Sequence, residues 1–163
     1  DERVSRGVVR LADDDAGELL TLQLAAWVRE MHANPGVQIP PLFEDLDDVR
    51  SQLADPAQTV WGVREGGRLI ATVRTSVRED GTAYVGRLGV VPDLNRQGLG
   101  GALLRHAEAL LPPTVPRIDL ITGAGSIDNH RFYARHGYRI VGPGPAHSTL
   151  RMVKDLEPAR GLT

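Results

Sequence analysis

A glycine-rich turn between an apolar strand and an amphipathic helix, within residues 87–111, constrains how this chain can fold more than any other feature. The strand pattern ends at Pro92, the turn contains Gly98 and Gly100, and the helical pattern follows from Ala102. Such a turn leaves unpaired backbone N–H groups at a helix N-terminus, where the helix dipole favours an anion. Glycine permits a close approach to the backbone that a Cβ would prevent. The segment therefore predicts a phosphate or pyrophosphate site.

The spacing of this turn excludes two common phosphate-binding motifs. A P-loop requires Gly-Lys followed by Ser or Thr, whereas Gly101 is followed here by Ala102. A dinucleotide fingerprint that begins at Gly98 requires glycine at the position of Leu103. That fingerprint also belongs to a parallel β-α-β unit, and the strand before this turn is expected to end an antiparallel meander.

Length and composition exclude several classes of protein. A chain of 163 residues fits one domain, and 41% hydrophobic residues with a net charge of −2 argue against disorder. No apolar run approaches the roughly 20 residues that a bilayer span needs. The pI near 6.2 lacks the basic footprint of a nucleic-acid-binding protein. Without cysteine there are no disulfides, cysteine zinc sites or thiol nucleophiles. We therefore expect a cytoplasmic protein that binds neither nucleic acid nor membrane.

The periodicity of the apolar residues predicts an α+β fold. The predicted strands are residues 8–11, 59–64, 68–77, 82–91, 117–122, 138–141 and 149–153. The predicted helices follow the aspartates 13–15 to about residue 32, and then cover 44–54, 102–111 and 128–136. The aspartates are interpreted as a helix cap rather than a metal site. The order β-α-α-β-β-β-α-β-α-β-β corresponds to a mixed central sheet flanked by helices.

The ends of the sequence are predicted to lie outside the folded domain. Residues 1–7 are interpreted as a disordered start or a cloning remnant, and residues 156–163 as a polar tail. Neither end has the pattern of a targeting signal. A single domain over residues 8–155 remains.

Two short stretches share the spacing of a known family. Leu88–Pro92 reads apolar-x-Val-x-Pro and is followed without a gap in the alignment by Asn95–Gly100, and Phe132–Tyr138 reads apolar-Tyr-x-x-x-Gly-Tyr. These stretches resemble the two signatures of the GNAT family of N-acetyltransferases, with Asn95 where the family has Gln or Arg. The predicted order of elements is also similar to the GNAT fold. The likeness covers about residues 8–155, and it implies an acyl-CoA N-acyltransferase domain.

The resemblance implies acetyl-CoA, or another acyl-CoA, as the donor, and no metal. In the family, the strand before the glycine turn diverges from the next parallel strand, and the pantetheine enters the gap. The main-chain amides of the turn hold the pyrophosphate, and Arg96 is assigned in addition to the 3′-phosphate or adenine side. The cofactor-binding residues implied in this way are Leu88, Gly89, Val90, Asn95, Arg96, Gln97, Gly98, Leu99, Gly100, Gly101, Ser126, Asn129 and Tyr133.

The implied reaction is the direct attack of a neutral amine on the thioester in a ternary complex, where holding both substrates together supplies most of the acceleration. A backbone N–H near Val90 is expected to stabilise the developing oxyanion. Tyr133 is placed as the catalytic acid that protonates the departing thiolate. The candidates for the base are Glu30, His32, Glu44, Tyr84 and His147. A chain of water molecules without a dedicated base is the alternative.

The sequence favours a small-molecule amine as the acceptor. Residues 35–43, with Pro40 and Pro41 ahead of Leu42 and Phe43, are expected to wall the acceptor pocket with apolar surface. The expected function is therefore the acetylation of a primary amine of a small molecule. A protein or peptide N-acetyltransferase and a non-catalytic acyl-CoA-binding module remain the alternatives. We expect a monomer or a homodimer.

Overall fold

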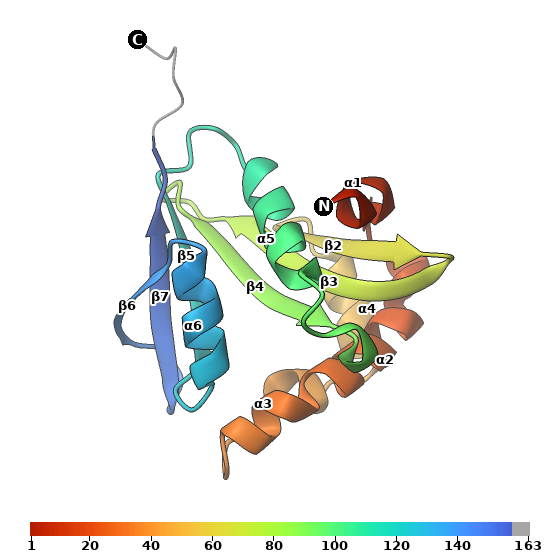
Figure 1. Ribbon diagram of the computed structural model, residues 1–163, viewed down its shortest axis with the longest axis horizontal. Coiled ribbons are helices and arrows are strands. Elements are labelled where there is room, and N and C mark those ends of the chain that lie inside the picture. Colours follow the sequence, from red (N-terminus) through yellow and green to blue (C-terminus); the bar gives the residue numbers. More distant parts are fainter. Residues whose placement is uncertain (158–163) are drawn as a thin grey trace.

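A seven-stranded mixed sheet runs through the molecule in the order β1-β2-β3-β4-β5-β7-β6, with helices on both faces (Figure 1). The computed structural model describes residues 1–157. The strands are β1 (Val8–Arg10), β2 (Gln58–Glu65), β3 (Arg68–Val77), β4 (Ala83–Val90), β5 (Arg117–Gly123), β6 (Arg139–Pro143) and β7 (Thr149–Asp155). The helices are α1 (Glu2–Gly7), α2 (Ala16–Ala26), α3 (Val28–Ala33), α4 (Leu46–Ala54), α5 (Leu99–Ala109) and α6 (Ile127–Arg135). The predicted α+β fold with a mixed central sheet is confirmed.

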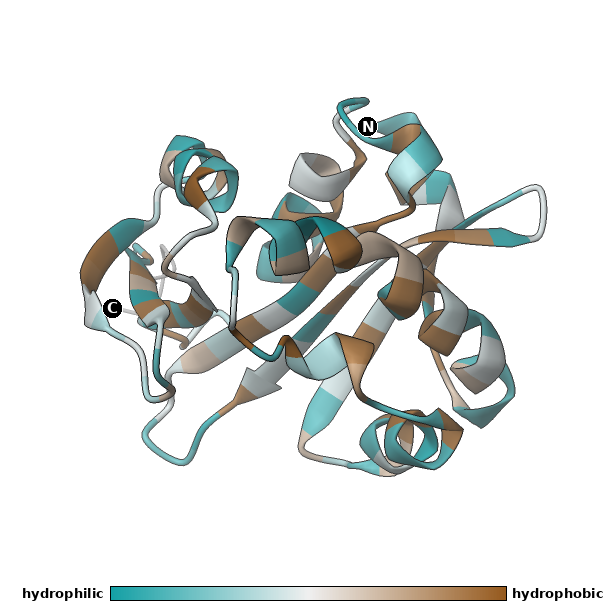
Figure 2. Ribbon diagram, turned by 90° about the horizontal axis from the view of Figure 1, so that it is seen from below, coloured by the Kyte–Doolittle hydropathy of each residue, from teal (hydrophilic) through white to brown (hydrophobic). Residues whose placement is uncertain are grey.

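The core lies between the central strands and the helices that cover them. All side chains from Leu69 to Val73 on β3 are buried, and α5 buries Leu99, Leu103 and Leu104 against β3 and β4. In Figure 1, α5 lies in front of the sheet and α4 behind it. Figure 2 shows hydrophobic positions along the central strands and again on the helices beside them. Burying each such side chain contributes roughly 1.5–3 kcal/mol, which fixes the start of α5 relative to the end of β4.

The sheet opens between β4 and β5, the central pair of parallel strands. Their register contains Ala83 opposite Ile118 and Tyr84 opposite Asp119, and the strands diverge beyond Tyr84. On its other side β4 pairs with β3 through an irregularity at Arg87, whose φ of 54° is left-handed. Because a β-bulge bends a strand and redirects its side chains, the second half of β4 is turned away from β5.

The first seven residues form a helix, although the sequence analysis expected disorder there. Asp1 caps α1 by accepting a hydrogen bond from the backbone N–H of Arg3 at 2.8 Å. Val4 is 2% exposed, and α1 packs against α5 and β2. A six-residue helix with a polar exterior has little intrinsic stability. The burial of Val4 and the packing of α1 against the domain therefore stabilise this helix. Of the expected polar tail, residues 158–163 lie outside the described residues.

Other helix boundaries also differ from the prediction, and two of the differences have an identifiable cause. The expected helix over residues 16–32 is divided at Trp27 into α2 and α3, and the indole of Trp27 packs against Gly89, where a Cβ would come within 2.6 Å of it. Helix α4 begins at residue 46 rather than 44 because Asp45 and Asp48 form a capping box. Within residues 1–157, no helix combines the length and apolarity needed to cross a lipid bilayer.

Candidate active site

The turn between β4 and α5 presents a row of free backbone amides. Arg96 and Gly98 have φ angles of 63° and 80°, so the chain turns sharply before the helix starts. The first helical hydrogen bond runs from Ala102 N–H to the Gly98 carbonyl at 3.1 Å. Among residues 1–157, the amides of residues 96–101 donate no hydrogen bond. The unpaired N–H groups that the sequence predicts at this turn are therefore present, and consecutive N–H groups at a helix N-terminus suit an anion.

A cavity of about 530 Å³ lies in front of this turn, and we refer to it as the first cavity. It extends from the end of β4 along the turn to α6. The sequence-predicted residues that line it are Leu88, Gly89, Val90, Asn95, Arg96, Gly98, Leu99, Gly100, Gly101, Asn129 and Tyr133. Two predicted residues do not. Gln97 accepts a hydrogen bond from Arg3 at 3.0 Å, and Ser126 lines a different cavity.

Sequence reasoning missed three arginines that line the first cavity together with Arg96. They are Arg29 on α3, and Arg131 and Arg135 on α6. Arg29 is paired with Asp128 at 2.5 Å. The signal that could have revealed the other two is their separation by four residues on the helix of the second signature, since residues at that spacing share one face. Together with the free amides, these cations suit a ligand with several negative charges.

A second cavity of about 460 Å³ borders the middle of β4, whereas the first borders its end. Its walls are the loop that follows α3, the middle of β4, the end of β5 and the turn before β7. Of the segment expected to wall an acceptor pocket, residues 37–41 line this cavity, whereas Leu42 and Phe43 do not. Phe43 is 65% exposed. The expected apolar wall is therefore met at the two prolines, joined by Val37 and Ile39, and not at Leu42 and Phe43.

The two cavities meet at four residues that line both of them: Glu30, Leu88, Asn129 and Tyr133. Tyr133 is half-buried, and burial raises the pKa of its hydroxyl, with Glu30 and Tyr84 adding to the shift. The Tyr133 hydroxyl is therefore protonated at neutral pH and can donate a proton or a hydrogen bond at this junction. A group that enters from one cavity can contact a group that enters from the other here.

Glu30 is oriented toward the junction by buried hydrogen bonds. Its carboxylate accepts from the Ser126 hydroxyl, which in turn accepts from Asn34 Nδ2 at 2.9 Å. The Oδ1 atom of Asn34 accepts from the backbone N–H of Gly125 at 2.8 Å, which ties α3 to the loop before α6. Of the candidate bases, Glu30, Tyr84 and His147 line the second cavity, whereas His32 and Glu44 line neither. Glu30 alone among them also reaches the first cavity.

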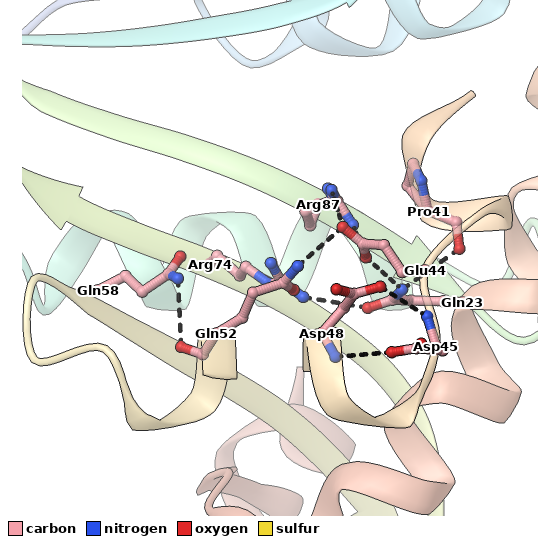
Figure 3. A network of polar contacts seen from close by, with 9 residues as sticks. All are labelled: Gln23, Pro41, Glu44, Asp45, Asp48, Gln52, Gln58, Arg74 and Arg87. Carbon is pink, nitrogen blue, oxygen red and sulfur yellow. Dashed lines mark hydrogen bonds and ion pairs between the residues drawn. The ribbon is translucent and has the colours of Figure 1, made fainter. Parts of the chain in front are cut away.

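Glu44 instead belongs to a polar network that includes two residues of the second cavity, Arg74 and Arg87 (Figure 3). Both oxygens accept from the Arg87 guanidinium, at 2.9 and 3.0 Å. Burial alone would raise the pKa of Glu44, but the hydrogen bonds and charge of Arg87, with Gln52 and Gln23, lower it to about 2. Glu44 is therefore ionised and fully engaged at neutral pH, so it is not available as a base. No sequence pattern indicates this pairing, because residues 44 and 87 lie on separate elements.

Known proteins share the fold of this chain. Residues 21–138 match the family model described as Acetyltransferase (GNAT) family. An acetyltransferase from Thermus thermophilus superposes with a TM-score of 0.75 at 18% identity, covering 92% of this chain and 97% of that one. The PaiA N-acetyltransferase from Thermoplasma acidophilum, solved in complex with coenzyme A, gives 0.76 at 15% identity, with coverages of 91% and 98%.

The ribosomal-protein-S18-alanine N-acetyltransferase from Escherichia coli is also similar, with a TM-score of 0.72 at 20% identity and coverages of 96% and 97%. At these identities the likeness concerns the fold. No curated protein sequence matches this chain. Residues 1–157 contain no group of three or more His, Asp or Glu side chains arranged to hold a metal ion.

Proposed function

Because the chain belongs to the Acetyltransferase (GNAT) family, we propose that it transfers an acetyl group from acetyl-CoA to the primary amine of a small molecule. Acetyl-CoA occupies the first cavity and the amine occupies the second. The observation that carries this proposal is the junction at which both cavities share Glu30 and Tyr133. A transfer between two bound substrates requires such a meeting point.

The first cavity suits the phosphates and the pantetheine of acetyl-CoA. The free amides of residues 96–101 and the side chains of Arg96, Arg131 and Arg135 offer donors to phosphate oxygens. Beyond Tyr84, β4 has no strand partner on its β5 side, so its backbone can pair with the amide groups of pantetheine. Leu88, Gly89 and Val90 then lie along the pantetheine and the thioester.

The reaction follows from the groups at the junction. The amine nitrogen attacks the thioester carbonyl, a C–N bond forms, and the C–S bond breaks. Glu30 takes the proton that the nitrogen loses, directly or through water, and the Tyr133 hydroxyl donates to the departing sulfur. A positioned acid or base contributes about 10²–10⁴-fold each, and a backbone N–H near Val90 stabilises the oxyanion.

The shape of the second cavity supports a small acceptor. Its volume of about 460 Å³ lies within the range of roughly 300–1,000 Å³ that is usual for small-molecule sites. Residues 37–41 and the turn at 145–149 wall it from two sides. An extended peptide would need a groove that is open at both ends.

The test measures thiol release from acetyl-CoA with a panel of small amines and short peptides, alongside calorimetry with acetyl-CoA. We expect binding of acetyl-CoA, turnover of small amines, and initial-rate lines that intersect, as a ternary complex requires. Absence of acetyl-CoA binding overturns the proposal. Turnover of peptides alone identifies a protein N-acetyltransferase, and binding with no turnover of any acceptor identifies a non-catalytic acyl-CoA-binding module.

A further inference from the structure

The second cavity is lined at one side by a buried arginine that has no ionic partner. Arg74 on β3 is 7% exposed. Among residues 1–157 its guanidinium forms no salt bridge. The one hydrogen bond of this group in that part of the chain runs from Nη2 to the Gln23 side-chain carbonyl at 3.0 Å. Buried guanidinium groups are normally paired, because an isolated charge removed from water is costly. An unpaired one that lines a cavity therefore marks a place for an anion.

Glu44 is the carboxylate whose charge acts on Arg74, and all of its hydrogen-bond acceptor sites are occupied by other donors. Its Oε1 atom accepts from Arg87 Nη1 and from Gln23 Nε2, the latter at 3.0 Å. Its Oε2 atom accepts from Arg87 Nη2 and from Gln52 Nε2, the latter at 2.8 Å. A carboxylate has about four lone-pair sites, and here all are used. The one carboxylate of this network is therefore taken by Arg87 (Figure 3), and the charge of Arg74 has no partner within it.

The remaining donors of Arg74 are open to the cavity. Within residues 1–157, its Nε and Nη1 atoms donate no hydrogen bond. Both atoms are accessible, because the buried side-chain atoms that lack a partner in those residues are Gln52 Oε1 and Arg117 Nε. Arg74 lines the second cavity. Burial and the neighbouring Arg87 lower the pKa of Arg74 to about 10, so it is still cationic at neutral pH.

A side chain of opposite charge, Glu30, lines the same cavity. Glu30 lines it at the junction with the first cavity, where the acetyl group is transferred. The other titratable side chains that line the cavity are Tyr84, Arg87, Tyr133 and His147, and Arg87 is neutralised by Glu44. The cavity therefore contains a carboxylate that lines both cavities, Glu30, and an unpaired guanidinium that lines the second cavity only, Arg74.

We propose that the acceptor is an amine that also carries a carboxylate, as an amino acid does. Its carboxylate accepts hydrogen bonds from Arg74, and its amino group points to Glu30 and Tyr133. The planar guanidinium fork suits a carboxylate better than any neutral group, and charge-assisted bonds of this kind are the strong ones. This inference rests on the proposed function, and it makes Arg74 a determinant of substrate specificity.

The test compares amino acids with their primary amides, which keep the amino group and remove the negative charge. For the unmodified protein we expect kcat/KM to be about tenfold or more higher for the acids, the value of one charge-assisted hydrogen bond. The variant R74Q lowers kcat/KM for the acids by a similar factor and changes that for the amides little. R74K restores part of the preference. The control R151Q, which removes an arginine bound to Asp119 outside both cavities, leaves it intact.

Calorimetry on the coenzyme A-saturated protein with the same pairs supplies a readout that does not depend on turnover. Tighter binding of the acids that is lost in R74Q supports the inference. Equal binding or equal turnover of acids and amides by the unmodified protein overturns it, whether or not R74Q folds, while the proposed function stands. Failure of acetyl-CoA to bind removes the proposed function itself.

Discussion

At the scale of single residues, the proposed chemistry depends on one hydroxyl, that of Tyr133, at the junction of the two cavities. We expect Tyr133→Phe to lower kcat by about 10²-fold, the contribution of a positioned acid, and to leave the affinity for acetyl-CoA nearly unchanged. Steady-state kinetics and calorimetry measure the two quantities. Tyr138→Phe is the matched control, because its hydroxyl donates to Glu108 at 2.7 Å and lines neither cavity. Unaltered turnover in Tyr133→Phe would remove this residue from the mechanism.

The depressed pKa of Glu44 predicts a loss of stability in acid. A carboxyl whose pKa is lower in the folded than in the unfolded chain stabilises the fold above its unfolded value, and this contribution disappears as pH falls through the folded value. For Glu44 the window runs from the ordinary 4.5 down to about 2. We expect the unfolding free energy to decline across this window. In Glu44→Gln the decline becomes shallower, and at pH 7 stability is lower by roughly 3 kcal/mol because the partly buried Arg87 guanidinium loses its counter-ion. Urea titrations at several pH values provide the measurement.

Most of the predicted residues that line the first cavity lie close together in the sequence. Gly98 and Gly100 line the first cavity because a turn and a helix start need them within a few positions of one another. Arg74 and Glu44 could not be placed in the same way. Their network joins α2, β3, β4 and the segment before α4, so it depends on how distant elements pack, and the expectation of Glu44 as a base overlooked Arg87 for that reason.

At the scale of elements, the glycines at the start of α5 leave the backbone open to close approach by a ligand. A Cβ at Gly100 would meet Val90 at 3.6 Å and Phe132 at 3.8 Å, which is ordinary contact, and would project toward the first cavity that Gly100 lines. We expect Gly100→Ala to leave stability unchanged or to raise it by up to about 1 kcal/mol, since alanine favours a helix. The same variant weakens acetyl-CoA binding about tenfold or more, through the loss of a close backbone contact.

Gly17→Ala is the control for Gly100→Ala. Gly17 also lies in the first turn of a helix, and a Cβ there would meet nothing within 4 Å. Melting curves and calorimetry should show a similar gain in stability with no change in acetyl-CoA affinity. If both variants bind acetyl-CoA as the unmodified protein does, the turn does not hold the cofactor.

The helix boundaries that were predicted wrongly from the sequence are those that depend on packing rather than on periodicity. The apolar spacing through Trp27 continues that of α2, and the break comes from the contact of its indole with Gly89 on β4. Helix α1 has one buried residue, Val4, which gives no period to detect. Long periodic elements such as β3 and α5 were predicted within a few residues, because their own pattern determines which face is buried.

At the scale of the whole molecule, the first seven residues connect the end of β2 to the glycine turn. Arg3 contacts Glu65 on β2 at 2.7 Å and Gln97 at 3.0 Å, while Val4 enters the core. We expect deletion of residues 1–7 to cost about 2 kcal/mol through the exposed apolar surface, and thus to lower Tm by roughly 5 °C. Differential scanning calorimetry measures the shift. A Tm that does not move would show that α1 adds nothing to the stability of the sheet.

The contact between Trp27 and Gly89 gives this protein a built-in optical reporter. The indole lies against β4 and lines the second cavity, where the acceptor is proposed to bind. Its fluorescence should respond when either substrate arrives, so stopped-flow mixing can resolve which one enters first without any attached dye. Replacing Trp61, the other tryptophan, by phenylalanine would leave a single emitter whose spectrum follows each catalytic cycle.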